Sequence, residues 1–142
     1  MDLKEIFLVS GKSGLYQLLT HNKNGAIVES LTDGKRMQIF ASDKASSLKD
    51  IAIFTESEDI PLAKVLQNIF KLEDGKSVEI NINDAIVLRA FMDKILPEWD
   101  KERVHTSDLK RLVTWYNLLL SKELIDLKEE ENEDRSTEIE NS

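Results

Sequence analysis

A short glycine-rich stretch is the first place where this sequence could bind a phosphate group. Residues 10–14, Ser-Gly-Lys-Ser-Gly, resemble the end of a phosphate-binding loop. The full pattern needs a glycine five positions before Gly11, where the chain has Ile6, and a helix directly after the loop. Residues 15–19, Leu-Tyr-Gln-Leu-Leu, follow instead and favour a strand. We therefore interpret this stretch as a turn.

Other catalytic chemistries lack their usual sets of residues. The chain has no cysteine, which excludes disulfides, thiol catalysis and cysteine-based metal sites within it. Its two histidines, His21 and His105, have no second ligand at a zinc-like spacing. No Gly-x-Ser-x-Gly motif marks a serine nucleophile. We predict that the protein is not an enzyme and that it has no catalytic, cofactor-binding or metal-binding residues.

Two groups of cationic and aromatic side chains could bind a partner. Single-stranded nucleic acids bind small barrels through cations and stacked aromatic rings, and protein interfaces favour Trp, Tyr and Arg. The structural alternative is that the cations are solvated and that the aromatic rings are buried in the core. The first group lies at predicted turns and contains Lys12, Tyr16, Lys23, Lys35 and Arg36, with Phe40 nearby; the second contains Trp99, Arg103, Lys110, Arg111 and Trp115.

Turn signals that would position the first group divide the first 55 residues at short intervals. Glycine, asparagine and aspartate cluster at residues 11–14, 22–25, 33–34 and 42–43. A spacing of about 8–12 residues between turns is typical of a small antiparallel sheet or barrel. We predict an SH3-like barrel with five strands at residues 6–10, 15–20, 26–31, 35–41 and 48–55.

Helical spacing of apolar residues predicts three helices in the remainder of the chain. The first follows Pro61, where Leu62, Val65 and Leu66 begin an apolar stripe. Asp84 is a suitable N-cap for the second helix, which ends before Pro97. Thr106 or Ser107 is expected to cap the third. The second and third helices should form a helical hairpin that docks on another part of the chain.

These elements predict an α+β protein in four parts. We expect a barrel-like domain with a closing helix at 1–72, a linker at 73–83, a helical hairpin at 84–127 and a disordered acidic tail at 128–142. The tail has two basic and seven acidic residues, whereas residues 1–127 have 17 basic and 20 acidic ones. Solvation is its default role, with binding of a basic partner or mimicry of nucleic acid as alternatives.

Hydropathy and charge give an expectation about location and partner. No apolar run approaches the roughly 20 residues that a membrane-spanning helix needs, and the first residues are too charged for a signal peptide. We therefore predict a cytoplasmic protein that does not bind membranes. Because the tail supplies most of the net charge of −8, that charge argues neither for nor against an anionic partner.

Several segments together resemble a family of small uncharacterised bacterial proteins. The resemblance covers roughly residues 3–127 and includes the stretch Ser-Gly-Lys-Ser-Gly-Leu-Tyr at 10–16, Asp-Ile-Ala-Ile-Phe-Thr at 50–55 and Trp-Tyr-Asn-Leu-Leu at 115–119. It implies a β-rich unit followed by a helical unit and brings no known activity. Ser13 departs from the family pattern, in which proline is frequent, and this change loosens the turn.

The sequence thus favours a non-catalytic binding or adaptor module in the cytoplasm that engages a protein partner. The alternative is an RNA- or DNA-binding accessory protein that uses the basic turns of the N-terminal barrel. The oligomeric state and the identity of the partner are open at this point.

Overall fold

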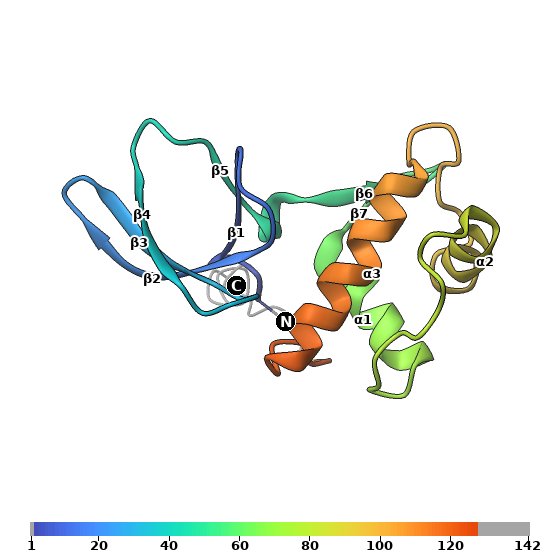
Figure 1. Cartoon of the computed structure of the whole chain (residues 1–142). Helices are drawn as coiled ribbons and strands as arrows, with labels where there is room; N and C mark the ends of the chain where they lie inside the picture. Colours follow the sequence, from blue (N-terminus) through green and yellow to red (C-terminus); the bar gives the residue numbers. More distant parts are fainter. Residues whose placement is uncertain (1, 128–142) are drawn as a thin grey trace, which may run out of the picture.

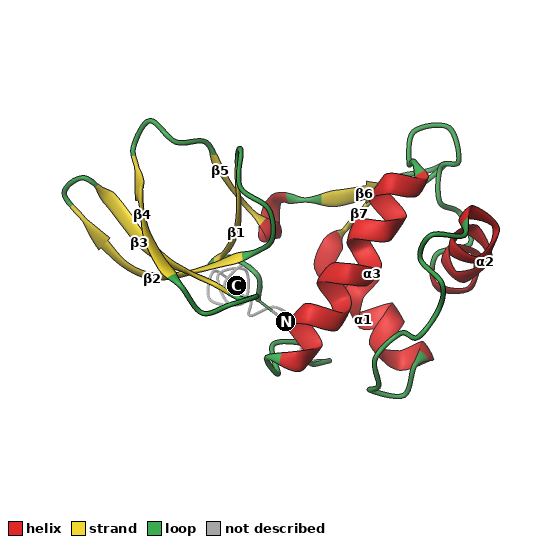
Figure 2. Cartoon of the chain, in the orientation of Figure 1, coloured by secondary structure: helices red, strands yellow, loops and turns green. Residues whose placement is uncertain are grey.

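The computed structural model describes residues 2–127, and in this range the chain is an α+β protein with two antiparallel sheets and three α-helices. Figures 1 and 2 show the larger sheet on one side of the molecule and the helices on the other. A pair of short strands, β6 and β7, lies behind the upper part of α3 in the view of Figure 1, and β6 follows the segment that leaves the larger sheet.

The larger sheet contains the N-terminal strands. Its order is β4-β3-β2-β1-β5, so β1 to β4 form a meander and β5 returns to pair with β1. The first four predicted strands are confirmed, and residues 10–14 form the turn between the first two. No β4–β5 ladder closes the sheet into a barrel within residues 2–127. The strands are β1 (Ile6–Val9), β2 (Tyr16–Asn22), β3 (Gly25–Ser30), β4 (Arg36–Phe40) and β5 (Ala45–Ser47).

The predicted fifth strand at 48–55 is correct only for residues 52–54, and these do not belong to the main sheet. The chain there forms a 3₁₀ turn, η1 (Leu48–Asp50), and then β6 (Ala52–Phe54), which pairs with β7 (Asp59–Pro61) outside the main sheet. The Ser47 hydroxyl caps the turn by accepting the Lys49 N–H at 3.2 Å and also donates to the Lys4 carbonyl. Leu48 is fully buried, so the turn anchors the chain where it leaves the sheet.

The three α-helices lie close to their predicted positions. They are α1 (Leu62–Leu72), α2 (Ala85–Ile95) and α3 (Thr106–Ser121). Asp84 is the N-cap of α2, as predicted, and its Oδ1 accepts from the N–H of Ile86 at 2.9 Å. The N-cap of α3 is His105 rather than Thr106 or Ser107, because the Asp108 carboxylate accepts the His105 N–H at 2.9 Å. Figure 1 shows α2 nearly end-on and α3 lengthwise, so these helices cross steeply.

One hydrophobic core extends through both halves of the molecule. α1 contacts η1 and β7 as well as α2 and α3. The predicted domain division at residue 72 stays a prediction, while the core itself is continuous across that position. Its fully buried members come from the sheet region, the 3₁₀ turn and all three helices, and they include Leu15, Leu48, Leu66, Leu88, Tyr116 and Leu119.

The segment at 73–83, predicted to be a linker, is fastened to α3. The side chain of Asn117 forms two hydrogen bonds with the backbone of Val78. Its Oδ1 accepts the Val78 N–H at 2.8 Å, and its Nδ2 donates to the Val78 carbonyl at 3.0 Å. The hydroxyl of Tyr116 donates to the Lys76 carbonyl at 2.8 Å. Val78 is 4% exposed. These bonds fix the orientation of α3, which carries one wall of the site described below.

Stability at alkaline pH should depend on Tyr116. Burial, and secondly the negative charge of Glu73, raise the pKa of the Tyr116 hydroxyl above its ordinary value. The folded state therefore keeps the proton more tightly than the unfolded state, so this contribution is complete below about pH 10 and is lost as the pH rises through the folded pKa. We expect the free energy of unfolding, measured by denaturant titration, to decrease above about pH 10.

The matched variant for this prediction is Tyr116→Phe, which removes the titrating group and keeps the ring. Its free energy of unfolding should fall less steeply between about pH 9 and about pH 11 than that of the wild type. Equal slopes for the two proteins would show that other groups cause the alkaline loss of stability.

Candidate binding groove

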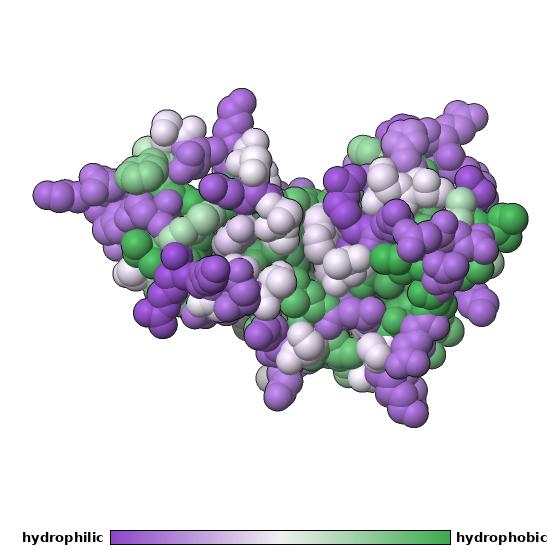
Figure 3. All heavy atoms as spheres, viewed as in Figure 1, coloured by the Kyte–Doolittle hydropathy of each residue, from purple (hydrophilic) through white to green (hydrophobic). Residues whose placement is uncertain are grey.

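A groove lies between the N-terminal sheet and α3. It has a volume of about 750 Å³. One wall is the turn between β1 and β2 together with Thr32, and the other is α3 with Arg103 and Val104, which precede it. Figure 3 shows the hollow between the two halves of the molecule, with apolar side chains in its depth and hydrophilic ones on both sides.

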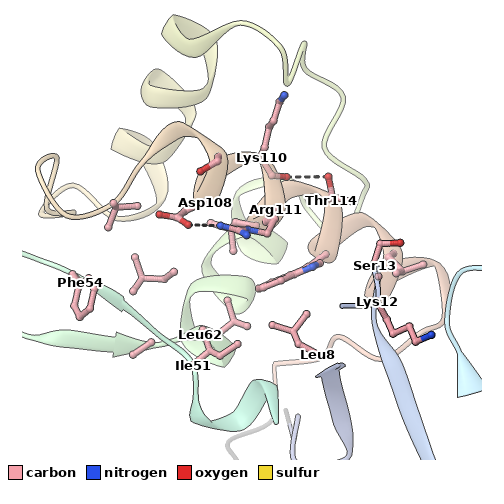
Figure 4. A pocket seen from close by; sticks show the side chains of 18 of the residues that line it. Leu8, Lys12, Ser13, Ile51, Phe54, Leu62, Asp108, Lys110, Arg111 and Thr114 are labelled. Atoms are coloured by element: carbon pink, nitrogen blue, oxygen red, sulfur yellow. Dashed lines mark hydrogen bonds and ion pairs between the residues drawn. The ribbon is translucent and has the colours of Figure 1, made fainter. Parts of the chain in front are cut away.

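Aliphatic side chains from distant parts of the chain form the floor of the groove. Figure 4 shows Leu8 of β1, Ile51 after the 3₁₀ turn and Leu62 of α1 close together below α3. Trp115 and Leu118 of α3 also line the groove, and both are half-buried. The turn of η1 is what brings Ile51 under α3. The floor can therefore hold apolar groups of a ligand.

Cationic side chains surround this apolar floor. Lys12 comes from the turn between β1 and β2, on the wall opposite α3 (Figure 4). Lys110 and Arg111 come from α3, where Lys110 points away from the floor, and Arg103 lies before the helix. Asp108 is the single carboxylate among the lining residues in the described part of the chain. The groove is thus positive, although residues 1–127 have more acidic than basic side chains.

The two arginines are held in place by aspartates. Nη2 of Arg111 is 2.7 Å from Oδ1 of Asp108, and Nε of Arg103 is 2.8 Å from Oδ2 of Asp100. The guanidinium of Arg103 also lies 4.2 Å from the centre of the Phe54 ring, and its Nη2 donates to the Thr55 carbonyl. Both guanidinium groups are thus oriented and keep donors for a ligand.

These contacts also shift the pKa values of the two aspartates. The hydrogen bond from the Arg103 side chain, and then that from the Glu102 N–H, lower the pKa of Asp100. Burial raises the pKa of Asp108, but the hydrogen bonds from the His105 N–H and from Arg111 outweigh burial and lower it overall. Both aspartates are therefore ionised at neutral pH and hold the arginines there.

The structure brings only Lys12 of the first predicted group into the groove. In a meander, successive turns lie at opposite ends of the sheet, so Lys23, in the turn between β2 and β3, lies at the end far from Lys12. Lys35 and Arg36 lie at the same end as Lys12 but outside the groove, and Arg36 pairs with Glu29. The three basic turns therefore do not form one patch.

The aromatic residues of the first group are separated in the same way. Tyr16 pairs with Ser30 at one end of β3, whereas Phe40 pairs with Gly25 at the other end. Tyr16 is half-buried and Phe40 is 52% exposed. The two rings are too far apart to stack neighbouring bases of one strand.

Most of the second predicted group lies in the groove. Arg103, Lys110, Arg111 and Trp115 line it, but Trp99 is only 2% exposed, and its Nε1 donates to Oδ1 of Asp93 at 2.8 Å. Trp99 is therefore part of the core. Sequence reasoning missed the aliphatic floor, because a residue that lines a groove has the same apolar pattern as one that packs in the core.

Metal-binding and membrane-spanning features are absent from the described part of the chain. No group of three or more histidine, aspartate or glutamate side chains in residues 2–127 is arranged to hold a metal ion. In the same range, no helix is both long enough and apolar enough to cross a bilayer.

Comparison with known proteins shows two matching families and one similar solved structure. A domain of unknown function, DUF5606, matches residues 3–48, and another, DUF6852, matches residues 51–119. The solution NMR structure of a protein from Bacteroides vulgatus is 37% identical, with a TM-score of 0.71, and the match covers 92% of this chain and 99% of that one. No curated protein matches the chain. The boundary between the two family matches lies at η1. The DUF6852 match therefore includes α1 together with α2 and most of α3.

Proposed function

We propose a binding function for this chain, which belongs to the same bacterial family of unknown function as the Bacteroides vulgatus protein. The proposed function is that of a non-catalytic adaptor module that engages a partner protein. The groove between the sheet and α3 is the proposed docking site.

The combination of an aliphatic floor and a cationic rim carries this proposal. Leu8, Ile51 and Leu62 offer apolar surface that a ligand can bury, and Trp115 adds an aromatic side chain of the kind that often dominates binding energy. Arg103 and Arg111 add oriented donors that give the site specificity. Apolar pockets with a few convergent polar groups are typical ligand sites.

The alternative function is binding of RNA or DNA. It is supported by Lys12, Lys35 and Arg36, which share one end of the sheet, and by the cations of α3. The separation of Tyr16 from Phe40 removes the stacking platform that this function was expected to use. We therefore favour a protein partner.

The finer description of the fold is also part of this proposal. The pairing of β5 with β1 supports an SH3-like sheet. It makes β4 and β5 the two edge strands, and no ladder joins these edges in the described residues. We propose that α2 and α3 form the helical unit that docks on this sheet through α1. The cytoplasmic location stays a prediction, and the predicted disorder of the tail concerns residues outside the described ones.

Affinity capture with charge-reversed variants tests the proposed function. Lys12 and Lys110 line the groove and form no ion pair within residues 2–127, so Lys12→Glu/Lys110→Glu should preserve the fold. We expect the wild type to retain a protein from a nuclease-treated cell extract and the double variant to retain about tenfold less. The matched control is Lys23→Glu/Lys35→Glu, which has the same net charge outside the groove.

Three other results would decide against this function. Equal capture by the two double variants would exclude the groove as the site. Loss of the captured material after nuclease treatment would favour the nucleic-acid alternative. A decrease in affinity with salt concentration that is much steeper than a few groove cations can cause would indicate contacts to many phosphates.

A further inference from the structure

One edge of β6 is unpaired at Ala52, a residue that lines the groove. In the β6–β7 pair, the Leu62 N–H donates to the Ile51 carbonyl at 2.9 Å and the Thr55 N–H donates to the Glu58 carbonyl at 3.0 Å. Bonded and non-bonded residues alternate in an antiparallel ladder. Ala52, which lies opposite Pro61, therefore points its N–H and carbonyl away from β7. Ala52 is exposed and lines the groove, and its backbone has no hydrogen-bond partner among the described residues.

The chain itself adds a short strand to the same edge farther along. Thr55 and Trp99 form an isolated antiparallel bridge, and the Asp100 N–H donates to the Phe54 carbonyl at 3.0 Å. Asp100 then accepts the N–H groups of Glu102 and Arg103, and this turn takes the chain away from β6. The edge is thus suited to an added strand, and its continuation at Ala52 is uncovered.

Charge determines what kind of strand fits there. Arg103 stacks on Phe54 of β6 and Arg111 projects from α3, so two oriented guanidinium groups lie on the same side of the groove as this edge. Lys12 lies on the opposite wall. Carboxylates form charge-assisted hydrogen bonds with such groups, and these are stronger than hydrogen bonds between neutral groups.

We propose that the groove binds an extended acidic segment of a partner protein, which adds to β6 beside Ala52 and places its carboxylates against Arg103, Arg111 and Lys12. This inference rests on the proposed function and specifies its ligand. Side chains alternate along an extended segment, so one row would lie on Leu8, Ile51 and Leu62 while the other reaches the cations. The expected ligand therefore alternates apolar and acidic residues.

A polypeptide fits the site better than a nucleic acid does. The free N–H and carbonyl of Ala52 match the backbone of a peptide, and nucleic acids offer no equivalent ladder. The floor is mainly aliphatic, with Phe54 and Trp115 as the aromatic lining residues in the described part of the chain. The guanidinium of Arg103 already lies 4.2 Å from the centre of the Phe54 ring, which leaves less of that ring for base stacking.

Amide hydrogen exchange at Ala52 tests the inference directly. The probe is a synthetic octapeptide of alternating glutamate and valine with blocked ends, titrated into the full-length ¹⁵N-labelled chain. At saturation, exchange of the Ala52 N–H should slow by about tenfold, because the peptide accepts a hydrogen bond from it. Exchange of the Ile53 N–H, which faces Ile60 in the existing ladder, should change little.

Charge variants and a second peptide provide the controls. Lys12→Glu should weaken peptide binding by about tenfold, while Lys23→Glu at the far end of the sheet should leave it unchanged. A lysine–valine octapeptide should not bind.

Each contrary result separates the inference from the proposed function. Binding in the groove without protection of Ala52 would overturn strand addition but leave the groove as a docking site. Absence of peptide binding at about 1 mM peptide would overturn the inference that the ligand is acidic. Capture of a protein that depends on the groove would in that case still support the proposed adaptor function. Displacement of the peptide by single-stranded oligothymidine would favour a nucleic acid.

Discussion

Replacement of Trp99 by alanine is expected to lower the free energy of unfolding by about 3–5 kcal/mol. The indole is 2% exposed, and its N–H donates to Asp93 at 2.8 Å. The backbone of Trp99 forms the bridge with Thr55 that attaches the loop before α3 to β6. Loss of the ring would therefore leave a cavity at the junction of this loop with the helices. Chemical denaturation of wild type and variant measures the effect.

Trp99→Phe is the matched control, because it keeps an aromatic ring and loses the hydrogen bond to Asp93. We expect it to lose about 1–2 kcal/mol, less than the alanine variant. Stability of Trp99→Ala within about 1 kcal/mol of the wild type would contradict the assignment of this residue to the core.

Local patterns allowed the sequence to predict most of the secondary structure. The first four strands follow turn residues whose conformational preferences do not depend on distant contacts. The start of α2 follows from the carboxylate of Asp84, which binds the first N–H groups of its own helix. These features involve residues close in sequence, so one sequence is sufficient to recognise them.

The prediction of one strand over residues 48–55 failed at residues 48–50, because the 3₁₀ turn that forms there depends on tertiary contacts. Residues 48–55 have the apolar character of a strand, but Leu48 is fully buried against other parts of the chain, and the Ser47 hydroxyl caps a 3₁₀ turn there. The burial of Leu48 involves α1, which begins 14 residues later. No local pattern indicates that this contact outweighs continuation of the strand.

The site was only half predictable for a related reason. Arg103, Lys110 and Arg111 were recognisable as a group because they are close in sequence. Their proximity to Lys12 depends on the packing of α3 beside the turn between β1 and β2, almost 100 residues away. The free edge at Ala52 exists only because the chain turns away at Asp100. Topology, rather than residue type, assembles the groove.

Replacement of Gly25 by alanine is expected to destabilise the protein by about 3 kcal/mol. Gly25 begins β3 with φ of +149°, a region that L-residues rarely adopt. A Cβ atom there would overlap the carbonyl oxygen of Ile39 and lie 2.9 Å from the Cα of Phe40. Both are backbone atoms of β4, so relief requires separation of β3 from β4. Thermal and denaturant unfolding should both show the loss.

Gly34→Ala separates the contact with β4 from backbone strain alone. Gly34 also has a positive φ, of +75°, but no atom lies within 4 Å of the position that its Cβ would take. We expect this variant to lose only about 1 kcal/mol, which is the cost of the left-handed backbone conformation. Equal losses for the two alanine variants would show that Gly25 is required for its conformation and that its close approach to Ile39 contributes nothing. A larger loss at Gly25 is expected from the overlap with β4 together with the less favourable φ of +149°.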